Sequence, residues 1–114
     1  MKIFNLTRQK TIASHGKTAD TFFSRMKGLL GTKRIGQNEA LIITRCKSIH
    51  MFFMSYSIDA IFVDEGNEVV GLVKNIKPWH LSPVFLRSSF VIESCPGIIT
   101  LTQTALGDKI KLEE

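Results

Sequence analysis

The sequence has few of the residues that mark special classes of protein. Its 114 residues include only two cysteines, three prolines and one tryptophan. Cys46 and Cys95 are too few for the disulfide framework of a small secreted domain, so we expect free thiols in a reducing compartment. No apolar run approaches the roughly 20 residues of a membrane span, and residues 1–10 lack the apolar region of a secretory signal. We therefore expect a soluble cytoplasmic protein without a membrane segment.

Internal repeats, low-complexity tracts and linkers are absent as well. Hydrophobic residues make up 44% of the chain and charged residues 22%, as in an ordinary globular protein. The length suffices for one hydrophobic core and not for an additional catalytic domain. The sequence predicts a single domain over residues 1–114, with room for one site.

Acidic residues are scarce in the first part of the chain. Residues 1–47 hold ten Lys or Arg against two acids, Asp20 and Glu39. Such a basic half could attract phosphate backbones or an acidic partner. Because most of these cations are spaced singly, a solvated basic face is the preferred interpretation and nucleic acid is not the expected partner. The residues of the nucleic-acid alternative are Lys27, Lys33, Arg34, Arg45 and Lys47.

The pattern of apolar residues predicts a β-rich domain. The run 58–64 hardly alternates, which indicates a strand buried on both faces, and "EGN" at 65–67 turns it into a hairpin. A break is expected at His15 to Lys17, and the prolines of "PWHLSP" at 78–83 predict a loop. The other expected strands are 2–6, 10–13, 40–44, 68–76, 89–93 and 109–113.

Two short helices are expected, at roughly 19–30 and 95–105. In the first, apolar side chains recur at helical spacing, and Thr18 or Asp20 can cap its N-terminus. The second segment admits a strand or a helix. Ser94 followed by Pro96 is typical of a helix start, so we choose a helix.

The order of several motifs resembles that of the domain of unknown function 192 family (DUF192). They are "ADTFFSRMKGLLG" at 19–31, the segment 46–79 that begins "CKSIHMFFMSYSIDAIFVD", "FVIESCPG" at 90–97 and "LGDKIKL" at 106–112. The resemblance implies an α+β domain with a curved, partly closed, half-barrel-like and mainly antiparallel sheet. It implies no reaction, because the family is named for having no established function.

Asp59 is the most demanding residue of the central stretch. It stands among apolar neighbours in the run 58–64, so its carboxylate must be hydrogen-bonded, paired or costly to bury. A buried acceptor for backbone N–H groups is the preferred interpretation, and a ligand-facing carboxylate is the alternative. Trp79 and His80 lie on a stiff loop between two prolines, where an aromatic side chain covers a core edge or presents a recognition surface.

We therefore predict a non-enzymatic domain that binds an unknown small molecule or protein partner, without a cofactor. Its site is expected around residues 46–59 and 78–83. The candidate ligand-binding residues are His50, Met54, Tyr56, Asp59, Trp79 and His80. The alternative is a small hydrolase or thiol-dependent enzyme that uses Cys46, His50 and Asp59.

A metal site in the same stretch is not predicted. Cys46, His50 and Met54 offer soft ligands suited to Cu(I). Their outer members are eight residues apart, which is roughly 27 Å along a strand or roughly 12 Å along a helix. One ion cannot contact all three unless the chain folds back, so a packed core is the preferred interpretation.

Overall fold

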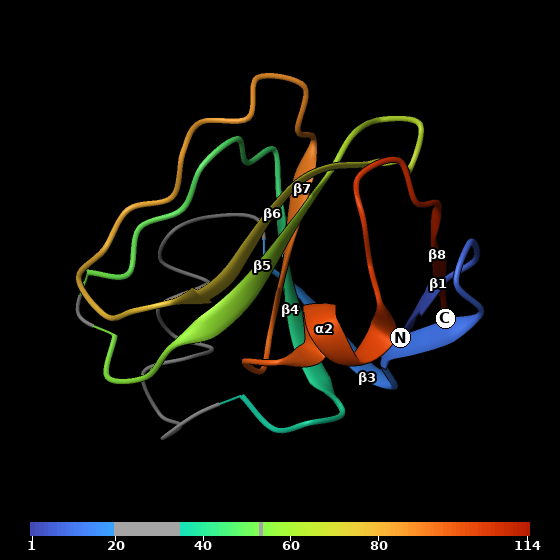
Figure 1. Cartoon of the computed structure of the whole chain (residues 1–114), viewed down its shortest axis with the longest axis horizontal. Helices are drawn as coiled ribbons and strands as arrows, with labels where there is room; N and C mark the ends of the chain where they lie inside the picture. The colour runs from blue at the N-terminus through green and yellow to red at the C-terminus, as the bar shows by residue number, and fades with distance from the viewer. Residues whose placement is uncertain (20–34, 53) are drawn as a thin grey trace.

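The computed structural model describes residues 1–19, 35–52 and 54–114, and β-strands dominate them (Figure 1). The prediction of a β-rich domain is therefore confirmed. The strands are β1 (Lys2–Asn5), β2 (Lys10–Ala13), β3 (His15–Ala19), β4 (Glu39–Thr44), β5 (Ile58–Val63), β6 (Val69–Ile76), β7 (Phe90–Ser94) and β8 (Ile110–Glu113), and the helix of this part is α2 (Ile98–Thr102).

The described strands form two sheets. One has five strands in the order β3-β4-β7-β5-β6, and the other has three in the order β2-β1-β8. The strand pairs are antiparallel apart from β3 with β4, as the mainly antiparallel prediction requires. The single curved, half-barrel-like sheet is not confirmed. Because β1 pairs with β8, the two ends of the chain lie together (Figure 1).

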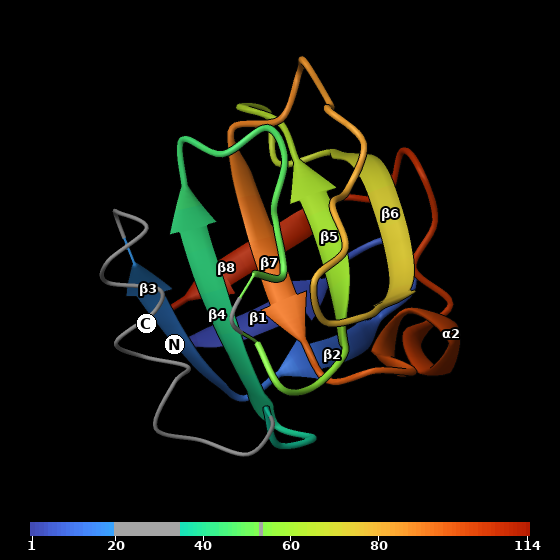
Figure 2. The ribbon, with the colours of Figure 1, turned by 90° about the vertical axis from the view of Figure 1, so that its left-hand side faces the viewer.

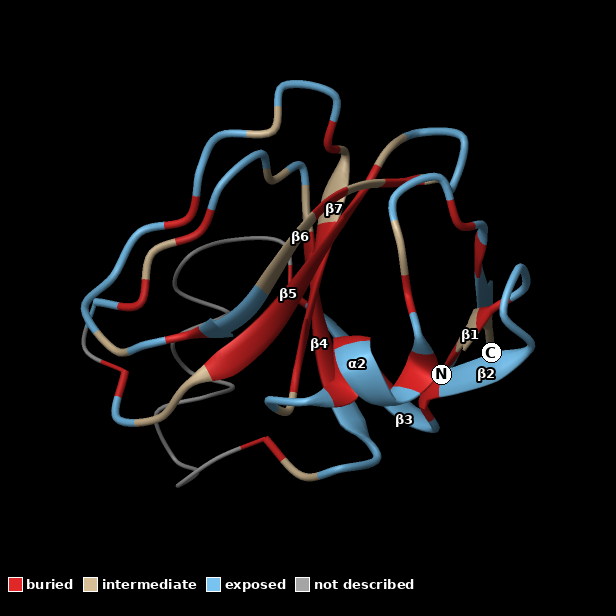
Figure 3. Ribbon diagram, viewed as in Figure 1, coloured by how far each residue is buried: buried red, intermediate tan, exposed pale blue. Residues whose placement is uncertain are grey.

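The five-stranded sheet is the middle layer of the molecule. Side chains alternate along β4, so that Leu41 and Ile43 enter one core cluster while Ala40 and Ile42 enter the other. The three-stranded sheet and α2 cover one face, and the segments before β5 and β7 cover the other (Figure 2). All six residues of β5 are buried, as its unbroken apolar run predicts (Figure 3).

The predicted hairpin of β5 and β6 is confirmed. Its turn is held by Asp64, whose Oδ1 accepts the backbone N–H of Gly66 and of Glu68, both at 2.9 Å. Asn67 takes a left-handed φ of 63° in the same turn, a conformation that asparagine adopts more readily than most residues.

The predicted break at His15 to Lys17 is wrong, because these residues belong to β3. Gly16 serves close approach rather than a turn: a Cβ there would lie 3.0 Å from Ile3 Cδ1. Its N–H donates to Met1 O at 2.7 Å. A residue without a side chain therefore lets the first strand pass without displacing Ile3.

Of the two predicted helices, the first lies outside the described residues apart from Ala19, the last residue of β3. Thr18 is in the same strand and is therefore no helix cap. The second is present but shorter than 95–105, because Gly97 and Gln103 both take left-handed conformations and bound α2. The search of the described segments for a helix with the length and hydropathy of a membrane span found none.

Candidate functional site

Two loops lie side by side over the five-stranded sheet (Figure 2): residues 45–57, between β4 and β5, and residues 77–89, between β6 and β7. We call them the loop pair. The two segments that the sequence predicts to share a site are thus neighbours. Their backbone hydrogen bonds are Phe85 N to Lys47 O (2.7 Å), Ser82 N to Ile49 O (2.9 Å), Met51 N to His80 O (2.9 Å) and Trp79 N to Met51 O (2.8 Å).

Side chains add to this ladder. The buried hydroxyl of Ser82 accepts the N–H of Ile49 at 2.9 Å and donates to Pro83 O at 2.9 Å. The ammonium of Lys47 donates to Leu86 O at 2.6 Å and to Ser88 O at 3.2 Å. Because both prolines of the second loop also fix their φ angles, the loop pair is a rigid platform despite its lack of regular strands.

Alternation continues from the strands into the first loop. Ile49 and Met51 are buried in the core over the sheet, whereas Phe52 is exposed and His50 is half-buried. The rings of His50 and Phe52 stack with centroids 4.7 Å apart, and Phe52 lies 6.0 Å from the ring of Trp79. We call these three residues the ring row.

Trp79 has an unusual backbone. Its φ is +67°, in a region that bulky side chains rarely enter and that costs roughly 1–2 kcal/mol. The hydrogen bond from its N–H to Met51 O holds this conformation, and yet 59% of the residue remains exposed. The predicted loop at 78–83 is confirmed, and of the two interpretations of Trp79 its exposure favours a surface role.

Large exposed hydrophobic residues occur on both loops of the pair, and long stretches of these loops are exposed (Figure 3). Contiguous apolar surface of this kind marks interaction sites in soluble proteins. Five of the nine such residues in the described part of the chain are here: Phe52, Trp79, Leu81, Val84 and Leu86.

The other four predicted site residues lie in four different places. His80 is exposed on the loop pair, beside the ring row. Met54 is buried in the core beneath it. Tyr56 lines a different cleft of about 420 Å³, together with Ile35, Gly36, Gln37, Ser57, Cys95 and Pro96.

Asp59 faces the opposite side of the sheet, toward α2. Its Oδ2 accepts the N–H of Gly97 at 3.1 Å and of Ile99 at 3.0 Å, and its Oδ1 accepts the N–H of Asn75 at 2.8 Å. Asn75 lies in a bulge, because two residues of β6 stand opposite Asp59 in the β5 register. A side chain that is 1% exposed and holds three backbone donors fits the structural interpretation made from the sequence.

The alternative enzyme with Cys46, His50 and Asp59 is wrong, because the fold separates its members. The N–H of Cys46 donates to the carbonyl of Ser89, the residue that precedes β7. Asp59 instead pairs with Ser94, the last residue of β7. Five residues of strand separate these points by about 17 Å. His50 lies over one side of the sheet and Asp59 faces α2 on the other.

The two thiols are free and are separated in the same way. Cys95 directly follows the far end of β7, so about 20 Å lies between the two backbones, against the 7 Å limit of a disulfide. Burial, followed by the charge of Asp59, raises the pKa of the Cys95 thiol. Protonation makes Cys95 a poor nucleophile. Within residues 1–19, 35–52 and 54–114, no three His, Cys, Asp or Glu residues gather as a metal site.

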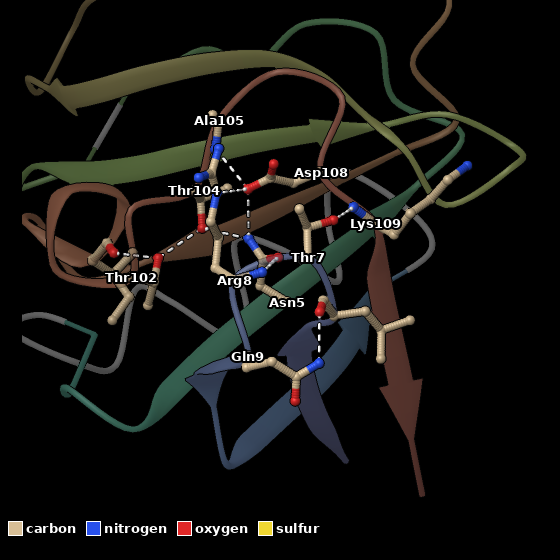
Figure 4. Close-up of polar contacts among 11 residues, drawn as sticks. Asn5, Thr7, Arg8, Gln9, Thr102, Thr104, Ala105, Asp108 and Lys109 are labelled. Atoms are coloured by element: carbon tan, nitrogen blue, oxygen red, sulfur yellow. Dashed lines mark hydrogen bonds and ion pairs between the residues drawn. The ribbon is translucent and has the colours of Figure 1, made fainter.

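Sequence reasoning missed two buried acids. Glu93 is fully buried in β7, and the strand period could have placed it on the same face as Val91, toward the core under the loop pair. Asp108 lies in a polar cluster that joins the end of β1 to the segment after α2 (Figure 4). Of the basic residues proposed for nucleic acid, Lys27, Lys33 and Arg34 lie outside the described residues.

The Asp108 cluster satisfies its own polar groups. Asp108 Oδ2 accepts from Asn5 Nδ2 at 3.0 Å, Arg8 Nε at 3.0 Å and Ala105 N at 2.9 Å (Figure 4). Asn5 Nδ2 also donates to Thr104 Oγ1 at 3.1 Å. Burial alone raises the pKa of Asp108, but these hydrogen bonds outweigh it and hold the pKa below its usual value. The cluster therefore stabilises the fold.

Comparisons with other proteins agree with this architecture. A crystal structure of a protein of unknown function from Novosphingobium aromaticivorans superposes with a TM-score of 0.78 at 21% identity, covering 97% of this chain and 82% of that one. At this identity the likeness shows the fold alone.

Relatives in sequence are uncharacterised proteins. A UPF0127 protein of Thermococcus sibiricus is 38% identical over 97% of this chain and 74% of its own length. The UPF0127 protein PH1112 of Pyrococcus horikoshii is 35% identical over 96% of both chains. Residues 4–112 match the family DUF192, described as "Uncharacterized ACR". The chain belongs to the DUF192 family.

Proposed function

We propose that this chain is a non-enzymatic domain that binds a protein partner through the outer surface of the loop pair. The observation that carries the proposal is the conformation of Trp79. A bulky residue with positive φ costs stability, and Trp79 keeps this conformation although 59% of the residue is exposed to solvent. Residues with a strained backbone persist where the surrounding structure holds them in place, and they are common at ligand-binding and other functional sites.

The rigidity of the platform supports this function. Binding is weakened by the entropy of ordering loops and side chains, so a pre-ordered surface retains more of its interaction energy. Here the backbone ladder fixes both loops, and stacking fixes the rings of His50 and Phe52. Aromatic residues held in this way are the usual anchors of protein interfaces.

The width of the surface favours a protein over a small molecule. Small-molecule sites enclose most of their ligand, whereas Leu81, Val84 and Leu86 are all more than 60% exposed along the second loop. In this assignment His50, Trp79 and His80 contact the partner and Met54 supports the platform from below. The ligand roles of Tyr56 and Asp59, and the cytoplasmic location, stay predictions.

Trp79 also provides the test, because it is the only tryptophan in the chain. A collection of 12-residue peptides of varied charge and hydropathy is titrated while Trp79 emission and backbone amide NMR shifts are recorded. We expect some peptides to shift the emission to the blue and to move amides of residues 47–52 and 79–87.

Two variants give the matched control. Leu81→Ser should weaken such binding about threefold to tenfold, because it removes an exposed apolar contact of the loop pair. Leu101→Ser, at a similarly exposed leucine of α2, should leave it unchanged. Binding that moves only amides outside the loop pair, or a collection that never alters Trp79 emission, would contradict the proposed function.

A further inference from the structure

The charge on the loop pair is of one sign. Neither Ala40 to Ile58 nor Val69 to Ile92 contains an aspartate or glutamate. The same stretches carry five Lys or Arg and two histidines. They are Arg45, His50, Lys47, Lys74, Lys77, His80 and Arg87. The apolar surface is thus bordered by cations from its own loops.

Carboxylates of the described residues leave most of that charge without an ion pair. The ion pairs among the described residues involve Arg8, Lys109 and Lys111, and none of the five Lys or Arg of the loop pair and β6. Asp64 and Glu65 approach at one end, where they line a depression with Lys47, Leu86 and Arg87. The other end, with Lys77, Trp79 and His80, carries positive charge from its own residues alone.

The shape of the apolar surface indicates what kind of anionic partner fits. The backbone of Trp79 bonds to Met51, and the backbone of Phe85 bonds to Lys47. The exposed residues from 79 to 86 therefore follow the first loop and form a stripe along these backbone hydrogen bonds. Four residues of the first loop span about 13 Å. A stripe beside cations matches a peptide segment with alternating apolar and acidic side chains.

Two other anionic partners fit less well. Bases of single-stranded nucleic acid stack on aromatic rings. The ring row offers such rings, but Leu81, Val84 and Leu86 beside it offer none. Interfacial membrane binding commonly uses a basic amphipathic helix, whereas this surface is built from two loops.

We propose that the loop pair binds an acidic protein segment whose apolar side chains lie on the ring row and the exposed leucines. This inference rests on the proposed function and names the chemistry of its partner. The segment's carboxylates meet Lys77 and His80, and its apolar side chains meet Phe52, Trp79 and Leu81.

The experiment uses four probes and the emission of Trp79 in the full chain. The first is a 14-residue peptide in which glutamate alternates with leucine and phenylalanine. The second is the same peptide with glutamine for every glutamate. The third probe is a vesicle of phosphatidylcholine that contains one quarter phosphatidylglycerol. The fourth is a 15-nucleotide oligouridylate. We expect the acidic peptide to bind at least tenfold more tightly than its glutamine counterpart, and to weaken between 50 and 300 mM salt.

Lys77→Gln should weaken binding of the acidic peptide about twofold to fivefold, the range for one exposed ion pair. Lys17→Gln removes the same charge from an exposed position of β3 and should leave the affinity unchanged. An equal effect of both variants would mean that net charge alone attracts the peptide, and would overturn the inference.

The outcomes separate the inference from the proposed function. If both peptides bind equally, the partner is not acidic and the proposed function stands. Should only the vesicles or the oligonucleotide change Trp79 emission, the partner is not a protein, and both proposals are wrong. If no probe changes the emission, the acidic segment is refuted, and the broader peptide collection decides the proposed function.

Discussion

Asp59→Ala gives the sharpest test of how this fold is held together. The substitution removes a carboxylate that accepts hydrogen bonds from three backbone N–H groups, those of Asn75, Gly97 and Ile99. These donors belong to the β6 bulge and to the start of α2. The side chain therefore joins β5 to two other elements at once.

The expected loss follows from these contacts. A hydrogen bond to a charged acceptor contributes about 1.5–3 kcal/mol, but the donors of Asn75 and Gly97 are only partly buried, so water can replace the carboxylate there. Taking the lower end for each bond gives a loss of about 3–5 kcal/mol. Since domains of this size are stable by about 5–15 kcal/mol, the variant should unfold if the parent lies at the low end of this range and should retain roughly two thirds to four fifths of its stability at the high end.

Urea unfolding followed by circular dichroism measures this loss. Asp64→Ala is the control, because it also removes a carboxylate that accepts two backbone N–H groups, in a solvent-accessible turn, and should cost about 1 kcal/mol. A loss below 1 kcal/mol for Asp59→Ala would refute the structural role and return Asp59 to the ligand-facing alternative.

Three further predictions concern stability. The pKa of Asp108 is lower in the folded chain than in the unfolded chain. Its contribution to the free energy of unfolding is therefore complete above the unfolded pKa near 3.9 and is lost as pH falls through the folded pKa. In urea unfolding, Asp108→Asn should lose less stability below pH 4 than the parent does. Ser94 has a buried hydroxyl without a hydrogen-bond partner among the described residues, so Ser94→Ala should leave the melting temperature unchanged or raise it, and a clear fall would contradict this. Gly71→Ala places a Cβ 2.5 Å from the Phe85 ring and should cost about 1–3 kcal/mol, a cost that Phe85→Ala in the same chain should remove.

The sequence predicts those features that depend on neighbouring residues. The apolar run of β5 indicates burial on both faces, and the turn residues after it indicate the hairpin with β6. Asp59 is recognisable as a demanding carboxylate from its apolar neighbours alone. In each case the determining residues lie within a few positions of one another.

Features that depend on residues far apart in the sequence cannot be predicted from local patterns. The donors to Asp59 lie 16, 38 and 40 positions away, and the Asn5 and Asp108 side chains are 103 positions apart. Strand β3 was missed because "HGK" is typical of a turn, whereas its partner β4 begins only at Glu39. The division into two sheets has the same origin, since β1 pairs with the last strand as well as with the next one.

A packing origin of the ring row is the alternative to a binding surface, and substitution of Trp79 tests it. Alternation explains why His50 and Phe52 are less buried than Ile49 and Met51 between and beside them. It does not set the conformation of Trp79, which is the third residue of a turn closed by His80 N to Lys77 O at 3.2 Å and takes its positive φ there. An asparagine or glycine adopts this φ at lower cost, so Trp79→Gly should leave the domain at least as stable in urea unfolding. If Trp79→Gly instead destabilises the fold by more than 2 kcal/mol, the indole is needed for packing, and the main support for a binding surface is lost.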